Sequence, residues 1–108
     1  MLGGIAALRA LRGVGFVPRR PIDVVMFTSE EPTRFGLSCA GSRAMAGALT
    51  PAALAALRDK NGTGWLAAAA AAGYGGGGGE QSEAGVLAAA RLRPGALASF
   101  VELHIEQV

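Results

Sequence analysis

Several features that would point to a particular protein class are scarce in this sequence. One cysteine, Cys39, stands among 108 residues, so no internal disulfide can form and no second thiol is available for a zinc knuckle or a redox pair. Arg9, Arg12 and scattered glycines interrupt the apolar runs, and none reaches the roughly 18 to 20 residues of a bilayer-spanning helix. Ten basic and eight acidic residues are spread along the chain without a basic cluster, which does not suit phosphate binding. We therefore expect neither a membrane nor a nucleic acid as partner.

The composition that remains is that of a folded protein. Hydrophobic residues make up 51% of the chain and charged residues 17%, a balance typical of one small globular domain and not of a disordered segment. Residues 1–20 are apolar, contain arginine and lack acidic residues. This pattern is also typical of a mitochondrial transit peptide, and that alternative stays open.

The beginning of the chain predicts a helix followed by a buried strand. In residues 2–13 small and apolar residues recur at steps of three and four, with Arg9 and Arg12 on the other side, which indicates an amphipathic helix. Residues 22–28 form a nearly continuous apolar, β-branched run, typical of a strand buried on both faces. Because such strands belong to sheets covered by helices, the sequence predicts an α/β fold.

Further helices and a low-complexity segment follow. Thr50 and Pro51 are a good N-cap and first helical residue, so we expect a helix over residues 51–58, and a further helical segment over residues 82–91. Residues 67–80 hold six consecutive alanines and a run of five glycines. The alanines can be helical, whereas the glycine run is interpreted as a flexible insertion, because no Lys, Ser or Thr follows it in the register of a phosphate-binding loop.

Two adjacent carboxylates, Glu30 and Glu31, come directly after the first predicted strand. In open α/β sheets, ligands bind beyond the carboxyl ends of the strands. Neighbouring residues in extended backbone point to opposite sides, so one carboxylate could bind a metal ion while the other faces a water on that ion. The alternative is a pair of solvated acids in a polar loop, and the spacing alone favours that alternative.

The only histidine, His104, lies in a second predicted strand over residues 100–107, in which apolar and polar residues alternate. It shares the polar face with Glu102 and Glu106, and imidazole with carboxylates is a usual ligand set for zinc or manganese. A lone histidine on such a face is more often an ordinary surface residue, and this alternative leads. Cys39 has no evident base beside it and is interpreted as a small packing residue.

Two strings of the sequence resemble one enzyme family. They read FTSEEPTRFGLSCAGSR at residues 27–43 and ELHIEQ at residues 102–107. Both closely resemble the plant ureidoglycolate amidohydrolases. These enzymes belong with the allantoate amidohydrolases and N-carbamoyl-L-amino-acid hydrolases, in the wider group of aminoacylase- and carboxypeptidase-like metallopeptidases. The resemblance covers most of the chain outside the alanine and glycine segment.

By that resemblance, the fold is a partial three-layer α/β/α catalytic domain of a dinuclear metallohydrolase, with an incomplete sheet. Residues 1–108 would be a fragment of one such domain, with residues 67–80 as a low-complexity insertion. The implied activity is metal-dependent hydrolysis of a linear ureido or amide C–N bond in allantoin and purine catabolism. The implied cofactors are two Mn²⁺ or Zn²⁺ ions, which share a water that attacks the amide carbon.

The resemblance also implies roles for single residues. Glu30 matches the general base, which takes the proton of the attacking water and passes it to the leaving nitrogen. Glu31 matches a ligand of one metal ion and His104 a ligand of the other. Gln107 matches a substrate-contacting residue, and Arg34 is a candidate for orienting the loop or the substrate.

The departures from the family pattern limit these expectations. The family's histidine-x-aspartate pair, its bridging aspartate, its last histidine ligand and its dimerisation domain have no match here, and Val108 stands where the family has glycine. We therefore expect poor metal affinity and an inactive isolated chain, with a homodimer and a small ureido or amide substrate for the complete enzyme. By resemblance to the plant enzymes, its location is the endoplasmic reticulum. The alternatives are a fragment of an allantoate or N-carbamoyl-amino-acid hydrolase, or a degenerate, non-catalytic binding module.

Overall fold

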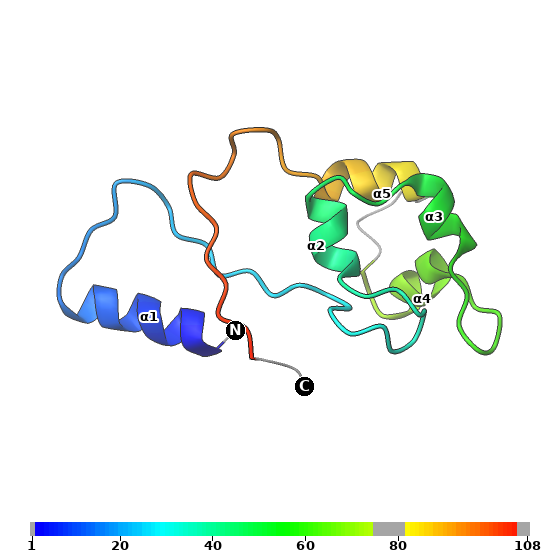
Figure 1. Ribbon diagram of the computed structural model, residues 1–108, viewed down its shortest axis with the longest axis horizontal. Coiled ribbons are helices and arrows are strands. Elements are labelled where there is room, and N and C mark those ends of the chain that lie inside the picture. Colours follow the sequence, from blue (N-terminus) through cyan, green and yellow to red (C-terminus); the bar gives the residue numbers. More distant parts are fainter. Residues whose placement is uncertain (1, 75–81, 106–108) are drawn as a thin grey trace. The chain divides into compact units, whose positions relative to one another are not determined.

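A computed structural model of the chain describes residues 2–74 and 82–105. These residues form five helices (Figure 1): α1 Leu2–Gly13, α2 Ala40–Met45, α3 Pro51–Ala56, α4 Trp65–Ala71 and α5 Glu83–Ala90. The chain divides into two compact units. The first unit consists of Met1–Met26 and Leu97–Val108, and the second of Phe27–Ala96. Each unit is described by itself below.

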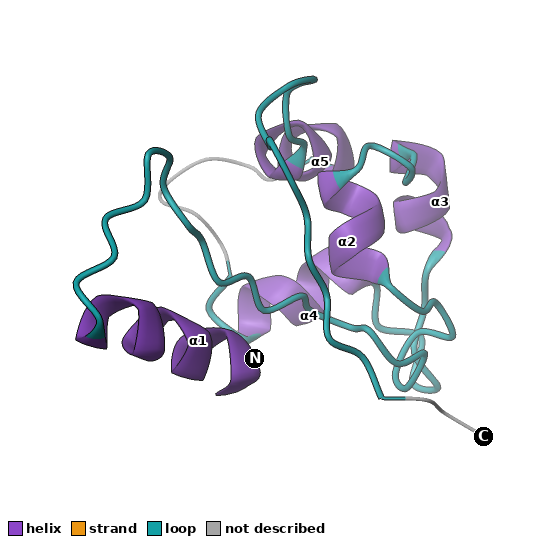
Figure 2. Ribbon diagram, turned by 60° about the vertical axis from the view of Figure 1, so that its left-hand side comes forward, coloured by secondary structure: helices purple, strands orange, loops and turns teal. Residues whose placement is uncertain are grey.

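The predicted α/β fold, a partial three-layer domain with an incomplete sheet, is wrong for the described residues. They contain helices and loops but no strand (Figure 2), and their one β-type pairing is an isolated antiparallel bridge between Arg58 and Gly64. Residues 22–28 and 100–105 have no regular secondary structure. An apolar, β-branched composition favours a strand, but a strand forms only where the backbone of a neighbour pairs with it. Residues 106 and 107 of the second predicted strand lie outside the described residues.

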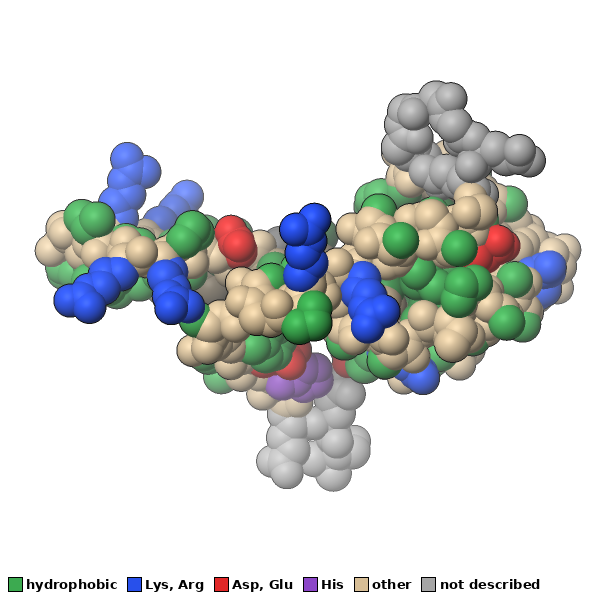
Figure 3. Space-filling model, turned by 90° about the horizontal axis from the view of Figure 1, so that it is seen from above, with side chains coloured by type: hydrophobic (Ala, Val, Ile, Leu, Met, Phe, Trp, Pro, Cys, Tyr) green, Lys and Arg blue, Asp and Glu red, His purple; other side chains and the backbone are tan. Residues whose placement is uncertain are grey.

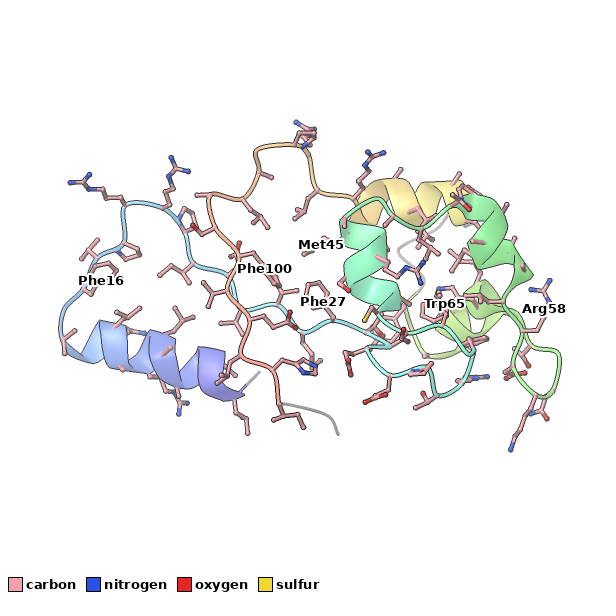
Figure 4. All side chains as sticks on the ribbon, in the orientation of Figure 1. Phe16, Phe27, Met45, Arg58, Trp65 and Phe100 are labelled. Atoms are coloured by element: carbon pink, nitrogen blue, oxygen red, sulfur yellow. The ribbon has the colours of Figure 1, made fainter. Side chains whose placement is uncertain are left out.

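The second unit has a small leucine core that holds four short helices together. Its buried members are Leu49, Leu54 and Leu87. Five partly buried side chains pack against them: Leu37, Ala44, Leu57, Trp65 and Leu66. The helices are six to eight residues long, which is too short for stability in isolation. Packing around the core, where Trp65 lies among the four helices (Figure 4), therefore stabilises them.

Local signals at the helix ends explain where α3 and α5 begin. The Thr50 hydroxyl accepts a hydrogen bond from the Ala53 amide at 3.2 Å, and the Ser82 hydroxyl accepts one from the Gly85 amide at 3.1 Å; both satisfy first-turn N–H groups. The Arg58 guanidinium donates to carbonyls at the end of α3, including that of Ala55. The helices predicted over residues 2–13, 51–58 and 82–91 are thus confirmed, the last two with shorter bounds.

The first unit lacks a comparable core among its described residues. No residue of α1 is buried, although the helix approaches its own unit closely: a Cβ added at Gly4 would lie 3.2 Å from a Val24 methyl group. Most of the exposed large hydrophobic side chains of the described chain belong to this unit, among them Val17, Val101 and Leu103. Hydrophobic side chains are accordingly visible at the surface in Figure 3. Among the described residues, no helix combines the length and apolar character that crossing a bilayer requires.

The leucine core predicts how the second unit responds to truncation. Leu54 is 2% exposed, so Leu54→Ala should lower the free energy of unfolding by about 2–5 kcal/mol through lost burial and a residual cavity. Urea unfolding followed by the fluorescence of Trp65, the only tryptophan, measures this. Leu92→Ala, at a leucine that is 36% exposed, is the matched control and should cost less than about 1 kcal/mol. Equal losses for the two variants would contradict the assigned core.

Candidate active-site loop

The glutamate loop, residues 28–41, carries Glu30 and Glu31 and is closed at its base by backbone hydrogen bonds. The amides of Cys39, Ala40 and Gly41 donate to the carbonyls of Glu30, Ser29 and Thr28 at 2.9, 3.1 and 3.0 Å. We call these three hydrogen bonds the neck. The first N–H groups of a helix have no partner within it. Here backbone carbonyls accept from the amides of Ala40 and Gly41 at the start of α2, whose N-cap residue Cys39 makes no side-chain cap.

Two residues of the neck adopt a backbone conformation that is unusual for their type. Ser29 has φ 51° and Cys39 has φ 55°, both in the left-handed region that non-glycine residues seldom occupy. Such a residue costs on the order of 1 kcal/mol or more and persists only where its surroundings enforce it. The neck hydrogen bonds provide that enforcement. Because the backbone turns at Ser29, the glutamates do not simply continue an extended segment, as the sequence had suggested.

Gly41 is required at the neck for a steric reason. A Cβ atom at this position would lie 2.8 Å from the Thr28 amide nitrogen and 2.9 Å from its carbonyl oxygen. Both atoms belong to the backbone and one of them is the acceptor of the Gly41 amide. Any side chain here would therefore push the Thr28 backbone away from the start of α2, to which the neck joins it.

An ion pair joins the far side of the glutamate loop to a turn 25 residues further along the chain. The Nε and Nη2 atoms of Arg34 donate to Oδ2 of Asp59 at 3.0 and 2.9 Å. The second oxygen, Oδ1, accepts from the amides of Asn61 and Thr63 at 2.9 and 2.8 Å. Asp59 thus satisfies two backbone groups of its own turn and two donors of Arg34. Its side chain is 5% exposed, whereas that of Arg34 is 55% exposed.

Aromatic side chains connect the same part of the loop to the core. The Arg34 guanidinium carbon lies 5.3 Å from the centroid of the Phe35 ring, within range of a cation–π interaction. The Phe35 ring meets Trp65 edge to face, with centroids 5.2 Å apart, a favourable arrangement of two aromatic quadrupoles. Since Trp65 packs against the leucine core, Arg34 and Phe35 fix the loop to the body of the second unit.

The environment of Asp59 lowers the pKa of its carboxyl group. The hydrogen bond from Arg34 is the largest cause, and the backbone amides of Thr63 and Asn61 and the charge of Arg34 act in the same direction. Burial opposes them, because it disfavours the charged form. The net lowering means that Asp59 remains an anion, and a partner for Arg34, through ordinary pH.

The structure places the predicted site residues as follows. Glu30 and Glu31 lie next to each other on the glutamate loop in the second unit, and both are exposed. His104 is exposed and belongs to the first unit. Its Nδ1 lies 2.7 Å from the carbonyl oxygen of Ile105, which accepts a hydrogen bond when Nδ1 carries a proton. Gln107 lies outside the described residues.

The donor groups can be compared with the expected metal ions. Carboxylate and neutral imidazole are donors that manganese and zinc accept, so the chemistry of Glu31 and His104 fits such an ion. Within residues 2–74 and 82–105, however, no three His, Cys, Asp or Glu side chains are grouped where they could hold a metal ion. Ligation by these residues stays a prediction.

The sequence is similar to known hydrolases along almost its whole length. It is 40% identical over 99% of its residues to ureidoglycolate hydrolase of Arabidopsis thaliana, covering 22% of that protein. It is 39% identical over 99% of its residues to N-carbamoyl-L-amino acid amidohydrolase of Geobacillus stearothermophilus, covering 24% of it. A probable allantoate deiminase of Oryza sativa subsp. japonica is 34% identical over 82% of the chain, which covers 16% of that relative.

The chain belongs to this family of amidohydrolases. It spans less than a quarter of the length of each of these three relatives. No protein-family model matches the sequence, and no solved structure does. The family resemblance read from residues 27–43 and 102–107 is therefore confirmed, while the roles of single residues in this amidohydrolase segment remain predictions.

Two residues that shape the site were missed in the sequence. Asp59 contacts the loop from a position far along the chain. The one signal in the sequence is the segment Asp59-Lys60-Asn61-Gly62, whose composition is typical of a turn. Gly41 stands within the family-like string, but nothing in the sequence shows that its neighbour in space is the Thr28 backbone.

The neck predicts a large effect of a small substitution. Gly41→Ala should destabilise the second unit by about 1–3 kcal/mol, the usual cost of forcing extra volume into a packed site, and Trp65 fluorescence during urea unfolding measures it. The control is Gly3→Ala, also in a helix, where the added Cβ would meet Leu103 at an ordinary 3.8 Å. The control should leave the midpoint unchanged, and a Gly41→Ala midpoint equal to that of the native chain would contradict the close approach.

The lowered pKa of Asp59 predicts a pH dependence of stability. The folded pKa lies below the ordinary 3.8, so the folded chain binds fewer protons than the unfolded chain in acid. The contribution of Asp59 is fully present above the unfolded pKa, about 3.9, and is lost as the pH falls through the lower folded pKa. The destabilisation caused by Asp59→Asn should thus be constant near neutrality and shrink below about pH 4. Urea midpoints of both proteins across this range test it, and a difference that widens in acid would contradict the sign.

Proposed function

We propose that this chain is a segment of a metal-dependent amidohydrolase that cleaves a linear ureido or amide C–N bond, with a ureidoglycolate-like compound as substrate. The observation that carries the proposal is the similarity to ureidoglycolate hydrolase across 99% of the chain. The family-like string at residues 27–43 contains the glutamate loop and the start of α2, and the loop presents two adjacent, exposed carboxylates. A general base and a metal ligand both need a carboxylate that the reacting water or the metal ion can reach.

In this proposal the two glutamates have different tasks. Glu30 is the general base: its carboxylate accepts a proton from the attacking water as the new C–O bond forms, and then delivers that proton to the leaving nitrogen as the C–N bond breaks. Glu31 and His104 are ligands of the two metal ions, Mn²⁺ or Zn²⁺. When bound, such ions lower the pKa of water and polarise the carbonyl group. Gln107 contacts the substrate, and Arg34 contacts the substrate or orients the loop.

The ligand set of the isolated chain is small. The chain has one histidine, whereas a two-metal site needs several ligands that converge on each ion. We therefore propose that the isolated chain binds metal weakly and has no turnover. The complete enzyme would be a homodimer, and by resemblance it would be located in the endoplasmic reticulum.

A second candidate substrate class has its own support. The similarity to N-carbamoyl-L-amino acid amidohydrolase of Geobacillus stearothermophilus also spans 99% of the chain, at 39% identity. The same residues would then act on an N-carbamoyl amino acid, because the bond that breaks is again a C–N bond next to a ureido carbonyl. Assaying ureidoglycolate, allantoate and an N-carbamoyl amino acid side by side distinguishes these substrates.

A chimera tests the proposed function and the division of tasks between the glutamates. This chain replaces the matching segment of Arabidopsis ureidoglycolate hydrolase, and the chimera is assayed for turnover and for bound metal. Glu30→Gln should lower kcat roughly a hundred- to ten-thousand-fold, the usual contribution of a general base, and leave the metal content unchanged. Glu31→Gln should lower both metal content and turnover, because a neutral amide is a poorer ligand for a divalent cation.

Each outcome bears on a separate claim. A folded, metal-loaded chimera without activity on any of the three substrates would contradict the proposed function. Activity with the reverse pattern, in which Glu30→Gln removes metal and Glu31→Gln retains it, would contradict the assigned roles but not the activity. Glu83→Gln, in the first turn of α5 and outside the glutamate loop, controls for the loss of one negative charge and should leave both measurements unchanged.

A further inference from the structure

We propose that Asp59 is a positioning residue for the reaction, which holds the glutamate loop in its working conformation through Arg34. The proposal rests on the proposed function, since it concerns how Glu30 and Glu31 are presented. Asp59 itself is not placed among the groups that act on substrate. Its contribution is the ion pair with Arg34 and the turn on which that ion pair is anchored.

The hydrogen bonds show which end of the ion pair is fixed. Both oxygens of Asp59 have partners: Oδ1 accepts from the amides of Asn61 and Thr63, and Oδ2 accepts from two nitrogens of Arg34. The Asp59 amide in turn donates to the Thr63 carbonyl at 3.0 Å, and the Gly62 amide donates to the Asp59 carbonyl at 2.9 Å. With its side chain only 5% exposed, Asp59 is locked into its turn and is the anchor, while Arg34 is the group that is held.

Because Arg34 is close to Glu30 and Glu31 in the sequence, fixing Arg34 also restricts the backbone of the two glutamates. On one side, Glu30 is fixed by its carbonyl, which accepts from the Cys39 amide in the neck. On the other side, Arg34 is fixed by Asp59. Glu31, Pro32 and Thr33 lie between these two points. Pro32 has a restricted φ, and the Thr33 amide donates to the Glu31 carbonyl at 2.9 Å. A segment this short, fixed at both ends, leaves the carboxylates few alternative positions.

The energetics favour a positioning role over a role in stability. Arg34 is 55% exposed, and solvent screening at the exposed partner reduces what the ion pair adds to the free energy of unfolding. The core that stabilises the second unit is made by leucines elsewhere. Reactions are far more sensitive to placement: a displacement of about 1 Å can lower a rate a hundredfold. Removing the ion pair should therefore alter loop order and kcat much more than the unfolding midpoint.

Two variants break the ion pair in different ways. Asp59→Asn keeps an oxygen for the amides of Asn61 and Thr63 but presents an uncharged group to the guanidinium. Arg34→Lys keeps the positive charge but cannot make the two hydrogen bonds of a guanidinium. Asp23→Asn, in the first unit, is the matched control for the loss of one carboxylate charge. The double variant Asp59→Asn with Arg34→Lys should be no worse than either single variant, because residues that act as a pair are not additive.

The first measurement is amide hydrogen exchange on the 108-residue chain, and it does not depend on any activity. Asp59→Asn and Arg34→Lys should each speed exchange at the Thr33 amide, which donates to Glu31, at least about tenfold, corresponding to about 1.4 kcal/mol of local opening. The amide of Leu54, which donates to the Thr50 carbonyl in α3, should be unaffected, as should both amides in Asp23→Asn. Unchanged exchange at Thr33 in both variants would overturn the proposal.

The second measurement is kinetics in the chimera with Arabidopsis ureidoglycolate hydrolase. Asp59→Asn should lower kcat at least about tenfold, with KM and bound metal nearly unchanged, because the base is misplaced while the binding groups remain. An active chimera whose kcat does not respond to Asp59→Asn would overturn the positioning role even if exchange changes. An inactive native chimera would contradict the proposed function and the kinetic part of this proposal, while the exchange data would still decide whether Asp59 holds the loop.

Discussion

The conformation of the glutamate loop depends on the way the start of α2 is capped. A short helix begins with N–H groups that need acceptors, and here the carbonyls of Thr28, Ser29 and Glu30 supply them. The same three hydrogen bonds fix the backbone of the first glutamate. One constraint thus both starts a helix and places a candidate catalytic group, and the left-handed conformations of Ser29 and Cys39 are its local cost.

Seen in this way, the family-like string at residues 27–43 has structural reasons for its residue types. Gly41 leaves room for the Thr28 backbone, Arg34 reaches the Asp59 turn, and Phe35 rests on Trp65. Glu30 and Glu31 stand between these contacts in the sequence and are exposed. A loop that is held at its neck, at Arg34 and at Phe35, with two exposed carboxylates between the neck and Arg34, has the organisation of a site more than that of a plain connection.

The sequence predicted α1, α3 and α5 but not α2, and its predicted sheet is wrong for the described residues. Helices are local: the periodicity of residues 2–13 and the caps at Thr50 and Ser82 contain nearly all that decides them, and the observed bounds agree within a few residues. A strand needs a partner, and the composition of residues 22–28 does not say whether a partner lies beside it; in the described chain none does. The same distinction divides the site. Glu30 and Glu31 could be found from their neighbours in sequence, whereas Asp59 works across 25 residues and became visible only in three dimensions.

The local character of the neck also has a consequence for the time course of folding. Its partners are separated by only about nine to thirteen residues along the chain, and loops of roughly this length close in about 10–100 ns. The entropy lost on closure is correspondingly modest, since it grows with the logarithm of loop length. The glutamate loop can therefore close and reopen many times before the leucine core has assembled. The members of that core come from residues 49 to 87. The closed loop then becomes stable only when the leucine core and the Asp59 turn have formed and hold it in place.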